Sequence, residues 1–427
     1  MMTYDLSGII KDKDALLEEF IDTYTACINL EDNDKVAHVI HYYQTIFDLF
    51  TKESHIEDIL LAFEKLAAYK LTLDIPYTII SNEIYGLENI MIINMPQDID
   101  NQQLLRLIKL FKAINNRVAH QYLLKYVDKL ISQNNVRQSS LSELVEKNLI
   151  VHYESHLIWL SDLAEHIRSN QKSAFPELDD NSCTFGKWLH TEAKQTIQNN
   201  SKYKAIDTIH KNLHMFAKKI YNILGMGEYH ILITYLEKCE MISLSIGTEL
   251  ALLDHMLINK KISKDNLTGA LSRNALHTLF ENEYELALAT NTSFILAICD
   301  LDHFKNVNDT YGHVAGDHVL EHFVSVVKKS LRASDVILRY GGEEFVIMLP
   351  AVNKENGYKV FEKIRKNFEK SPTHFNGENI FCTVSIGMIE IHPVHMYKKN
   401  FVDEYIMMAD HNLYMAKENG RNRVEYC

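Results

Sequence analysis

The stretch DVILRYGGEEFVIMLP, residues 335–350, decides the fold of the C-terminal part of the chain. Two apolar, β-rich runs flank the pair Gly341-Gly342. A Gly-Gly pair between strands indicates a tight hairpin, because both residues can take positive φ. Glu343 and Glu344 follow the turn directly. The sequence therefore places two carboxylates at the tip of a strand pair.

A second apolar run ends in carboxylates farther upstream. The run SFILAIC, residues 293–299, leads directly into Asp300 and Asp302. Helical segments such as HVLEHFVSVVKKSLR (318–332) alternate with β-rich ones such as IFCTVSIGMIEI (380–391), which indicates an α/β sandwich on a central mixed sheet. Carboxylates at two strand tips can hold a hard cation such as Mg²⁺. For either segment alone, a solvated acidic turn is the alternative interpretation.

Taken together and in this order, the segments resemble the GGDEF family of diguanylate cyclases. The resemblance rests on DxDxFKxxND (300–309), RxxDxxxRYGGEEF (332–345) and Tyr-x-Ala-Lys-x-x-Gly-Arg-Asn (414–422). It covers about residues 265–424. The family has Asp or Glu at the third signature position, so Glu343 fits an active signature.

The resemblance implies a role for each matching side chain. The implied ligands of two Mg²⁺ or Mn²⁺ ions per half-site are Asp300, the backbone carbonyl of Leu301, Glu343 and Glu344. The implied substrate ligands are Asn308 and Asp317 for guanine, and Lys305, Lys417 and Arg421 for the β- and γ-phosphates. Glu344 would be either a second-metal ligand or the group that eases deprotonation of the attacking hydroxyl. The family's opening segment differs here at Ala270 and Ser272.

The implied reaction condenses two GTP molecules into cyclic di-GMP, with one GTP held by each domain of a homodimer. Arg332 and Asp335 match the family's inhibitory site, which implies feedback by the product. The competing functions are a catalytically inactive cyclic di-GMP receptor and a zinc-sensing signalling scaffold. Retention of the signature carboxylates favours the enzyme.

The helical block upstream carries a second set of metal-ligand residue types. His210 and His214 lie four residues apart, so they share one helix face. With His156 and with Cys183 in the string CTFGKW, they resemble the chemoreceptor zinc-binding domain, a four-helix bundle with a three-His, one-Cys site. The resemblance implies a closed structural or regulatory Zn²⁺ site. We expect zinc to inhibit the cyclase, because the encounter of two half-sites needs mobility. His152 competes for the first position, and the tryptophan at 159 favours His156.

Helical periodicity and composition divide the chain further. The expected domains are a helical sensor or interaction domain (1–131), the zinc-binding bundle (141–226), a coiled-coil linker (228–262) and the GGDEF domain (263–427). The polar stretch SQNNVRQSS, residues 132–140, is typical of a linker. The expected fold class is multidomain, with all-α N-terminal bundles, a coiled-coil stalk and a C-terminal α/β domain.

The stalk is expected from a heptad repeat, which favours a parallel dimer. The alternative is one amphipathic helix packed on its own domain. The seam positions are Leu232, Leu236, Cys239, Ser243, Ile246, Leu250, Leu253 and Leu257.

The N-terminal block has no motif that names a ligand. Its histidines leave room for a haem sensor, since haem needs a proximal His in an apolar pocket. Surface histidines of a helical bundle are the favoured interpretation. The four histidines in question are His38, His41, His55 and His120.

The bulk composition limits partners and location. A formal charge of −13 argues against a nucleic-acid surface, which needs a basic footprint. Six scattered cysteines suit a reducing cytosol. The chain has neither an apolar run of membrane-spanning length nor a signal-peptide pattern, so we expect a cytoplasmic protein without a membrane segment.

Overall fold

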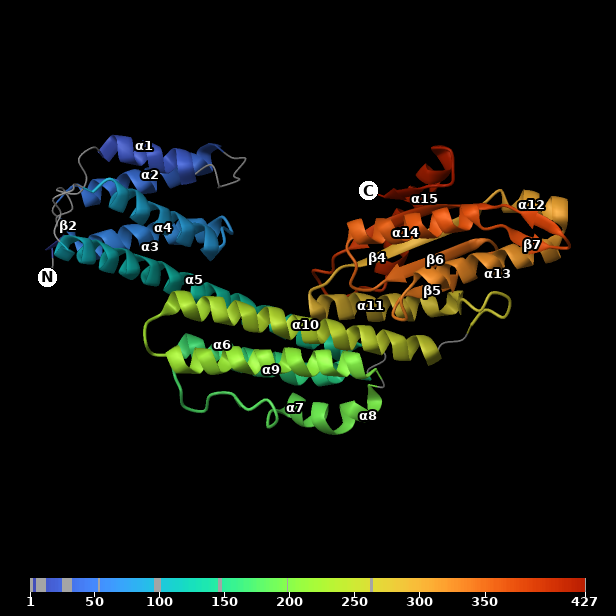
Figure 1. Ribbon diagram of the computed structural model, residues 1–427, viewed down its shortest axis with the longest axis horizontal. Helices are drawn as coiled ribbons and strands as arrows, with labels where there is room; N and C mark the ends of the chain where they lie inside the picture. Colours follow the sequence, from blue (N-terminus) through green and yellow to red (C-terminus); the bar gives the residue numbers. More distant parts are fainter. Residues whose placement is uncertain are drawn as a thin grey trace. The chain divides into compact units, whose positions relative to one another are not determined.

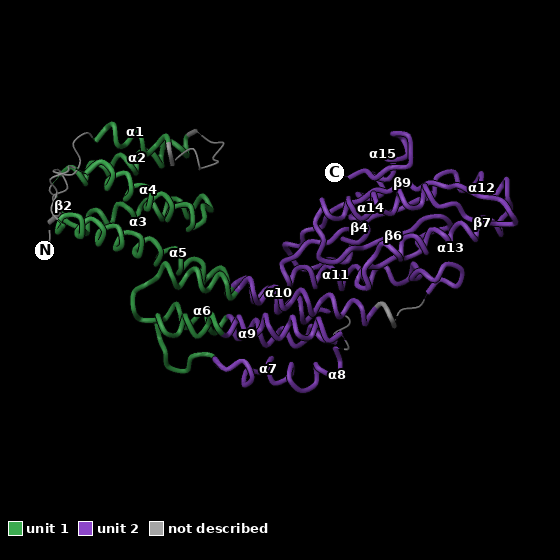
Figure 2. Tube along the Cα trace, viewed as in Figure 1, with its two compact units in different colours: residues 1–131, 161–176, 215–239 green, residues 132–160, 177–214, 240–427 purple. Residues whose placement is uncertain are grey.

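A computed structural model describes residues 3–4, 13–24, 33–52, 54–95, 101–144, 148–197, 199–261 and 264–426. The chain divides into two compact units (Figure 2). Unit 1 comprises residues 1–131, 161–176 and 215–239, and unit 2 comprises residues 132–160, 177–214 and 240–427.

Unit 1 is built from helices around an aromatic core. Its N-terminal elements are β1 (Thr3–Tyr4), α1 (Lys13–Tyr24), α2 (Asn33–Phe50), β2 (Ser54–His55), α3 (Ile56–Thr72), α4 (Tyr77–Ile93) and the first part of α5 (Asn101–Glu143). Phe20, Phe47 and Phe63 are fully buried. Lys70 and Glu83 form a buried ion pair that the Tyr43 hydroxyl also contacts. The opposite charges and the hydrogen bond from Tyr43 to Glu83 Oε2 offset the cost of burying this pair, while Glu83 Oε1 has no hydrogen-bond partner among the described residues.

The helical part of unit 2 includes segments of long helices and several short ones (Figure 1). The long helices are α5, α6 (Tyr153–Ser169), α9 (Asn200–Ile223) and α10 (Tyr229–Lys261). The short ones are η2 (Ile150–His152), α7 (Thr184–Trp188), η3 (Leu189–Ala193) and α8 (Lys194–Thr196).

Residues 132–140 are helical, which corrects the expected linker. They continue α5 without a break. The polar side chains of this stretch bond to residues far along the chain: Arg137 to Glu240 at 3.0 Å, and Asn134 Nδ2 to the Leu157 carbonyl at 3.4 Å. Buried polar side chains are tolerated where they are hydrogen-bonded. Composition alone could not show these partners.

The predicted heptad seam lies on α10 and is buried by the chain itself. All seam residues from Leu232 to Leu253 are at most 7% exposed. In unit 2, Ile246, Leu250 and Leu253 belong to one core with residues of α6 and α7. The seam of α10 therefore packs on the chain's own domain, as in the alternative interpretation. A dimer that used this seam would require the core to open.

By length and composition, one described helical segment, Tyr229–Ile258 on α10, could cross a membrane. Half of its most apolar window is buried inside the fold. A buried core helix passes the same test, so this finding is weak support for a membrane span.

The C-terminal domain is built on a six-stranded sheet, and the predicted mixed sheet is confirmed. The strand order is β10-β9-β4-β6-β5-β3, with parallel pairs at both edges and antiparallel pairs inside. These strands are β3 (Leu271–Ser272), β4 (Phe294–Asp302), β5 (Val336–Arg339), β6 (Glu344–Leu349), β9 (Thr383–Ile391) and β10 (Val424–Tyr426). A separate hairpin pairs β7 (Thr373–Phe375) with β8 (Glu378–Ile380).

Helices cover both faces of this sheet (Figure 1). They are η4 (Arg273–Ala275), α11 (Leu276–Thr290), α12 (Phe304–Tyr311), α13 (His313–Ser330), α14 (Lys354–Lys370) and α15 (Phe401–Glu418). On β4, Ala297 and Cys299 face the core with α13 and α14, whereas Leu296 and Ile298 face the core with α11 and α15. Since side chains alternate along a strand, Asp300 projects to the face covered by α15.

A buried cluster of charged groups joins α10 to α11. The His255 imidazole forms an ion pair with Glu283, and both side chains are at most 3% exposed. Asp254 accepts hydrogen bonds from the backbone of Leu149 at 2.6 Å and Ile150 at 3.0 Å. Burial lowers the pKa of His255, but the charges of Glu283, Asp254 and Asp335 outweigh burial, and the net shift is upward.

This raised pKa predicts a pH-dependent stability. Its contribution is fully present below the unfolded-state pKa of about 6.5 and is lost as pH rises through the higher folded-state value. We expect the free energy of unfolding, measured by urea denaturation, to fall over that range, and His255→Gln to flatten the fall. His395→Gln, at an exposed position, is the control. If the free energy of unfolding of His255→Gln fell with pH as steeply as that of wild type, another group would be responsible for the pH dependence.

Candidate active site and zinc centre

The tips of β4 and β6 bring the two acidic segments to one place. Asp300 stands directly opposite Glu344 in the antiparallel ladder. The backbone N–H of Leu301 donates to the Glu343 carbonyl at 3.4 Å. Directly opposed residues project to the same face of a sheet, with Cβ atoms about 5 Å apart. The acidic side chains of the two strands therefore share the face covered by α15.

Burial and like charge make this site unfavourable for carboxylates without a cation. Asp300 is 8% exposed, and burial raises its pKa although Lys417 Nζ lies 2.9 Å from its Oδ2. Burial also raises the pKa of Glu343, and the charge of Asp300 adds to the rise. A divalent cation would relieve both desolvation and repulsion. Because hard metal ions prefer carboxylate oxygens as ligands, this donor set fits a metal ion in addition to the Lys417 ammonium group.

The glycines of the hairpin provide space rather than a left-handed turn. Neither Gly341 nor Gly342 has positive φ, which corrects the expectation from the Gly-Gly pair. A Cβ at Gly341 would lie 2.5 Å from Glu344 Oε2. Glycine therefore leaves room for the Glu344 carboxylate to fold over the turn. The N–H groups of Tyr340 and Gly341 donate to the Glu344 carbonyl at 2.8 and 3.2 Å, which closes the loop.

The residues assigned to guanine lie at the corner between α12 and α13. Asn308 is half-buried, and its carboxamide packs where Gly316 has no side chain, since a Cβ there would collide with Asn308 Oδ1. Asp317 follows Gly316 and is exposed on α13, just after the first turn of that helix. Lys305 is exposed on the first turn of α12. The structure thus places an amide and a carboxylate near one another, with a cation on the adjoining helix.

The other two assigned cations lie at the end of α15. Lys417 is in the last turn and pairs with Asp300. Arg421 lies just beyond the helix, where its Nη1 donates to the Lys417 carbonyl at 3.4 Å. The charge of Arg421 also opposes the rise in the pKa of Asp300. Both cations therefore act on the side of the sheet that holds the carboxylates.

Arg332 and Asp335 form a tight turn before β5. The Arg332 N–H donates to Asp335 Oδ2 at 2.7 Å, and burial raises the pKa of Asp335. The turn lines a hollow of about 170 Å³ together with Lys264 and Lys328. Lys328 Nζ donates to the Gly269 carbonyl at 2.6 Å. Three cationic side chains around one hollow make it suitable for an anionic ligand.

Cys183, His210 and His214 converge in a separate, buried cluster. One possible ligand atom from each lies within 4.8 Å of the others. Cys183 Sγ is 3.3 Å from His210 Nε2, and His214 Nδ1 bonds to the Leu178 carbonyl at 3.1 Å. That second bond directs Nε2 of His214 toward the cluster. Sequence reasoning missed the Leu178 carbonyl, because a backbone acceptor leaves no signal in the side-chain pattern.

The cluster's electrostatics agree with a metal centre. Burial raises the pKa of Cys183 and lowers the pKa of His210 to about 3. The N–H of Gly186 donates to Cys183 Sγ at 3.2 Å, and a Cβ at residue 186 would collide with the Asp180 carbonyl. Neutral imidazoles and a thiol that can lose its proton to a metal are suitable ligands for Zn²⁺. This donor set therefore fits zinc.

His156 lies beside the cluster, and its rival His152 does not. The His156 ring is 3% exposed and its centroid is 5.1 Å from that of His210. Among the described residues, His156 Nδ1 has no hydrogen-bond partner, and burial lowers the pKa of His156 well below its usual value. His152 stacks on Trp188 with ring centroids 4.0 Å apart. These positions favour His156 as the fourth ligand, although it lies outside the tight three-residue cluster.

The histidines considered for haem do not line the large cavity of unit 1. That cavity, of about 740 Å³, is lined by residues of α4, α5 and α10, among them Tyr85, Phe111 and His230. His38, His41 and His55 are exposed, and the half-buried His120 stacks on Tyr229. The described part of the chain therefore gives the haem hypothesis no support.

Comparison with known proteins adds two family matches. Residues 262–423 match the family model described as "Diguanylate cyclase, GGDEF domain", and residues 156–221 match "Chemoreceptor zinc-binding domain". The second match begins at His156 and includes Cys183, His210 and His214.

Three relatives named as diguanylate cyclases illustrate the similarity. DgcP of Pseudomonas aeruginosa is 39% identical over 167 residues, which are 39% of this chain and 24% of that protein. DosC of Escherichia coli K12 is 30% identical over 297 residues, 68% of this chain and 62% of that protein. DgcZ of Escherichia coli K12 is 27% identical over 296 residues, which are 68% of this chain and 96% of that protein. The chain spans less than two thirds of the length of the first two.

Proposed function

Because the chain contains a GGDEF domain and a chemoreceptor zinc-binding domain, we propose that it is a diguanylate cyclase that condenses two GTP molecules into cyclic di-GMP. The observation that carries the proposal is the strand register that sets Asp300 opposite Glu344, beside Glu343. An inactive cyclic di-GMP receptor would not need these carboxylates, so their retention and convergence favour the enzyme.

Each catalytic step uses groups from named strands and helices. Asp300, Glu343, Glu344 and the Leu301 carbonyl would hold two Mg²⁺ or Mn²⁺ ions, which neutralise phosphoryl oxygens and make the ribose 3′-hydroxyl more acidic. Asn308 and Asp317 orient guanine. Lys305, Lys417 and Arg421 bind the phosphates. The residue assignments from sequence and the positions described above both support these roles.

The reaction joins two half-sites. The 3′-oxygen of one GTP attacks the α-phosphorus of the other, the bond from that phosphorus to the bridging oxygen breaks, and pyrophosphate leaves with its electron pair. The hydroxyl proton passes to Glu344 or to water. A second, symmetrical attack closes the ring. Because each domain holds one GTP, the enzyme acts as a homodimer, and its substrate pool places it in the cytoplasm.

Zinc at Cys183, His156, His210 and His214 would regulate the cyclase. One hydrophobic core joins the zinc cluster to the cyclase domain. It contains Cys183 of the cluster and the neighbouring Phe185, Leu250 on α10, and Leu286 and Ala289 on α11. Zinc would hold these helices in one arrangement, whereas the encounter of two half-sites needs mobility. We therefore expect zinc to inhibit.

A single assay separates the candidate functions. Purified chain is incubated with GTP and Mg²⁺, with and without a zinc chelator, and cyclic di-GMP is measured together with binding of added cyclic di-GMP. The enzyme forms product, and more of it after chelation. Binding without synthesis would establish the receptor instead, and neither binding nor synthesis would leave the zinc scaffold. Less product after chelation would reverse the sign of zinc regulation.

Product feedback predicts a specific behaviour of Arg332→Ala. We expect progress curves of the wild-type chain to flatten as cyclic di-GMP accumulates, and those of Arg332→Ala to stay linear about tenfold longer, because a charge-assisted bidentate contact is lost. The initial rates of wild type and Arg332→Ala should agree, since Arg332 lines the hollow with Lys264 and Lys328 and not the site at the strand tips. Lys329→Ala is the control, because Lys329 lies beside Lys328 in the last turn of α13 but does not line the hollow. Equal curvature in both variants would remove the feedback role.

A further inference from the structure

The loop that carries Arg421 has an unusual backbone for its sequence. Gly420, Arg421 and Asn422 have φ values of 109°, 63° and 47°. Left-handed conformations are common for glycine and tolerated by Asn, but they cost other residues about 1 kcal/mol or more. Such a loop persists only where surrounding contacts determine it. The contacts of the residues next to Arg421 therefore determine where its side chain lies.

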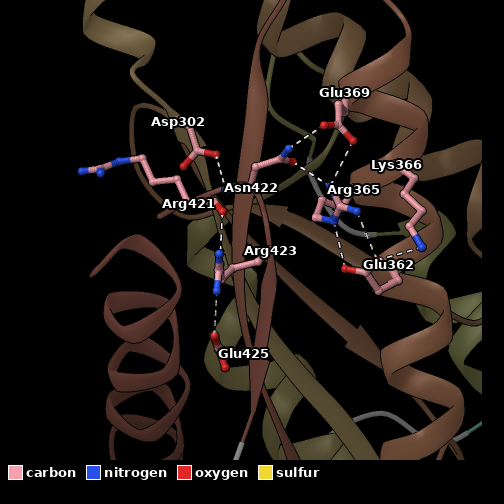
Figure 3. A network of polar contacts seen from close by, with 9 residues as sticks. All are labelled: Asp302, Glu362, Arg365, Lys366, Glu369, Arg421, Asn422, Arg423 and Glu425. Carbon is pink, nitrogen blue, oxygen red and sulfur yellow. Dashed lines mark hydrogen bonds and ion pairs between the residues drawn. The ribbon is translucent and has the colours of Figure 1, made fainter. Parts of the chain in front are cut away.

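Asn422 is the point at which this loop is held (Figure 3). Its backbone N–H donates to Asp302 Oδ2 at 3.0 Å. Its side-chain Oδ1 accepts from Arg365 Nη1 at 2.9 Å, and its Nδ2 donates to Glu369 Oε1 at 2.7 Å. Every polar group of the Asn422 side chain is therefore bonded to α14, while its backbone is bonded to the end of β4.

Two of the three partners of Asn422 are themselves held by further bonds. The Asp302 carboxylate is 4% exposed and accepts from Thr383 Oγ1 and Ser385 Oγ, each at 2.7 Å. The Arg365 guanidinium is held by Glu362 Oε1 at 2.9 Å and Glu369 Oε2 at 3.1 Å. Two strands and one helix thus converge on one loop residue. Strand tips and a helix packed on a sheet are rigid, so their bonds to Asn422 fix the position of the loop.

The Arg421 side chain lies apart from the α14 part of this network (Figure 3). Figure 3 shows the Arg421 side chain extending away from Asn422, Arg365 and Glu369. The next residue, Arg423, accepts at its carbonyl from the Ile386 N–H at 2.9 Å and leads into β10. Arg421 is therefore the exposed residue of a loop held on both sides, with Lys417 on one side and the Asn422 network on the other.

We infer that Asn422, Arg365 and Asp302 are positioning residues that hold Arg421 for phosphate binding, a role that deepens the proposed function and rests on it. Arg365 and Asn422 act through Arg421 and contact no substrate. A guanidinium on a preorganised loop loses less entropy on binding phosphate than one on a mobile loop. Removal of the network should therefore weaken GTP binding and leave the chemical step nearly unchanged.

The test uses Asn422→Gly, because glycine keeps positive φ accessible and removes only the side-chain bonds. We expect the KM for GTP to rise about tenfold and kcat to change less than about twofold, since phosphate contacts contribute equally to the ground and transition states. Arg365→Gln should reproduce this effect from α14. Asn419→Ala is the matched control, because Asn419 is exposed at the start of the same loop and its side chain bonds to Glu425 and not to the network.

A double-mutant cycle distinguishes positioning from general stability. If Asn422 acts through Arg421, then Asn422→Gly adds nothing to KM once Arg421→Ala is present. Additive effects of the two changes would overturn the inference, as would an unchanged KM in Asn422→Gly.

Affinity for 3′-deoxy-GTP, which lacks the attacking hydroxyl, is measured in parallel because it requires no turnover. We expect the same tenfold loss in Asn422→Gly. An unchanged affinity overturns the positioning role even if the wild-type chain makes cyclic di-GMP. Failure of the wild-type chain to make product, with the tenfold loss of affinity still present, overturns the proposed catalysis and leaves the positioning role standing.

Discussion

Replacing Glu344 with Gln is expected to lower cyclic di-GMP formation at least about a hundredfold while the fold remains intact. Glu344 opens β6 opposite Asp300, and its carboxylate lies over Gly341. Gln has nearly the same shape, so it keeps the packing and the Tyr340 and Gly341 bonds to the Glu344 backbone carbonyl. What it removes is the negative charge that would bind a divalent cation or accept the hydroxyl proton.

The measurement is the initial rate of cyclic di-GMP formation at saturating GTP, with circular dichroism as the check on folding. Glu378→Gln makes the same chemical change at an exposed position in the β7–β8 hairpin and should leave the rate unchanged. A folded Glu344→Gln protein with the rate of Glu378→Gln would mean that the strand-tip carboxylates have no catalytic part.

The second large effect is expected at the zinc centre. Cys183→Ala removes the only sulfur ligand of the three-residue cluster and should lower zinc affinity by more than about a hundredfold. Bound zinc after purification should fall from about one ion per chain to almost none. Because Cys183 also caps α7 through the Gly186 N–H, the variant should melt at a lower temperature than the zinc-loaded wild-type protein.

Metal content by mass spectrometry and a chelator competition measure the first effect, and thermal unfolding with and without chelator measures the second. Cys239→Ala is the matched control, since Cys239 is equally buried and lies outside the described metal cluster. The chelator should destabilise wild type and Cys239→Ala but not Cys183→Ala. Retention of one zinc ion by Cys183→Ala would mean that the metal is bound elsewhere.

The sequence predicts strands β4 and β6 well because their signals are local. The apolar run before Asp300 and the runs around Gly341-Gly342 have strand composition, and an antiparallel pairing of them brings the acidic tips together. The role of the glycines could not be predicted in the same way. Positive φ and room for a neighbouring side chain both favour glycine, and only the position of the Glu344 carboxylate distinguishes them.

The features that the sequence could not settle depend on partners that are distant along the chain. Residues 132–140 have linker composition, yet Arg137 bonds to Glu240, so the polar stretch remains helical. The heptad on α10 has the same 3-4 spacing whether its seam meets a second copy or the chain's own core. The Asn422 network joins three elements through Asp302 and Arg365, and no short motif records such a junction.

We propose that the strand-tip carboxylates of β4 and β6 catalyse the joining of two GTP molecules. The quantities of cyclic di-GMP and of pyrophosphate that the purified chain forms from GTP and Mg²⁺ test this proposal. We expect two pyrophosphates for each cyclic di-GMP. GTP that binds but stays unconverted, or GTP that is hydrolysed without cyclic di-GMP appearing, would contradict it.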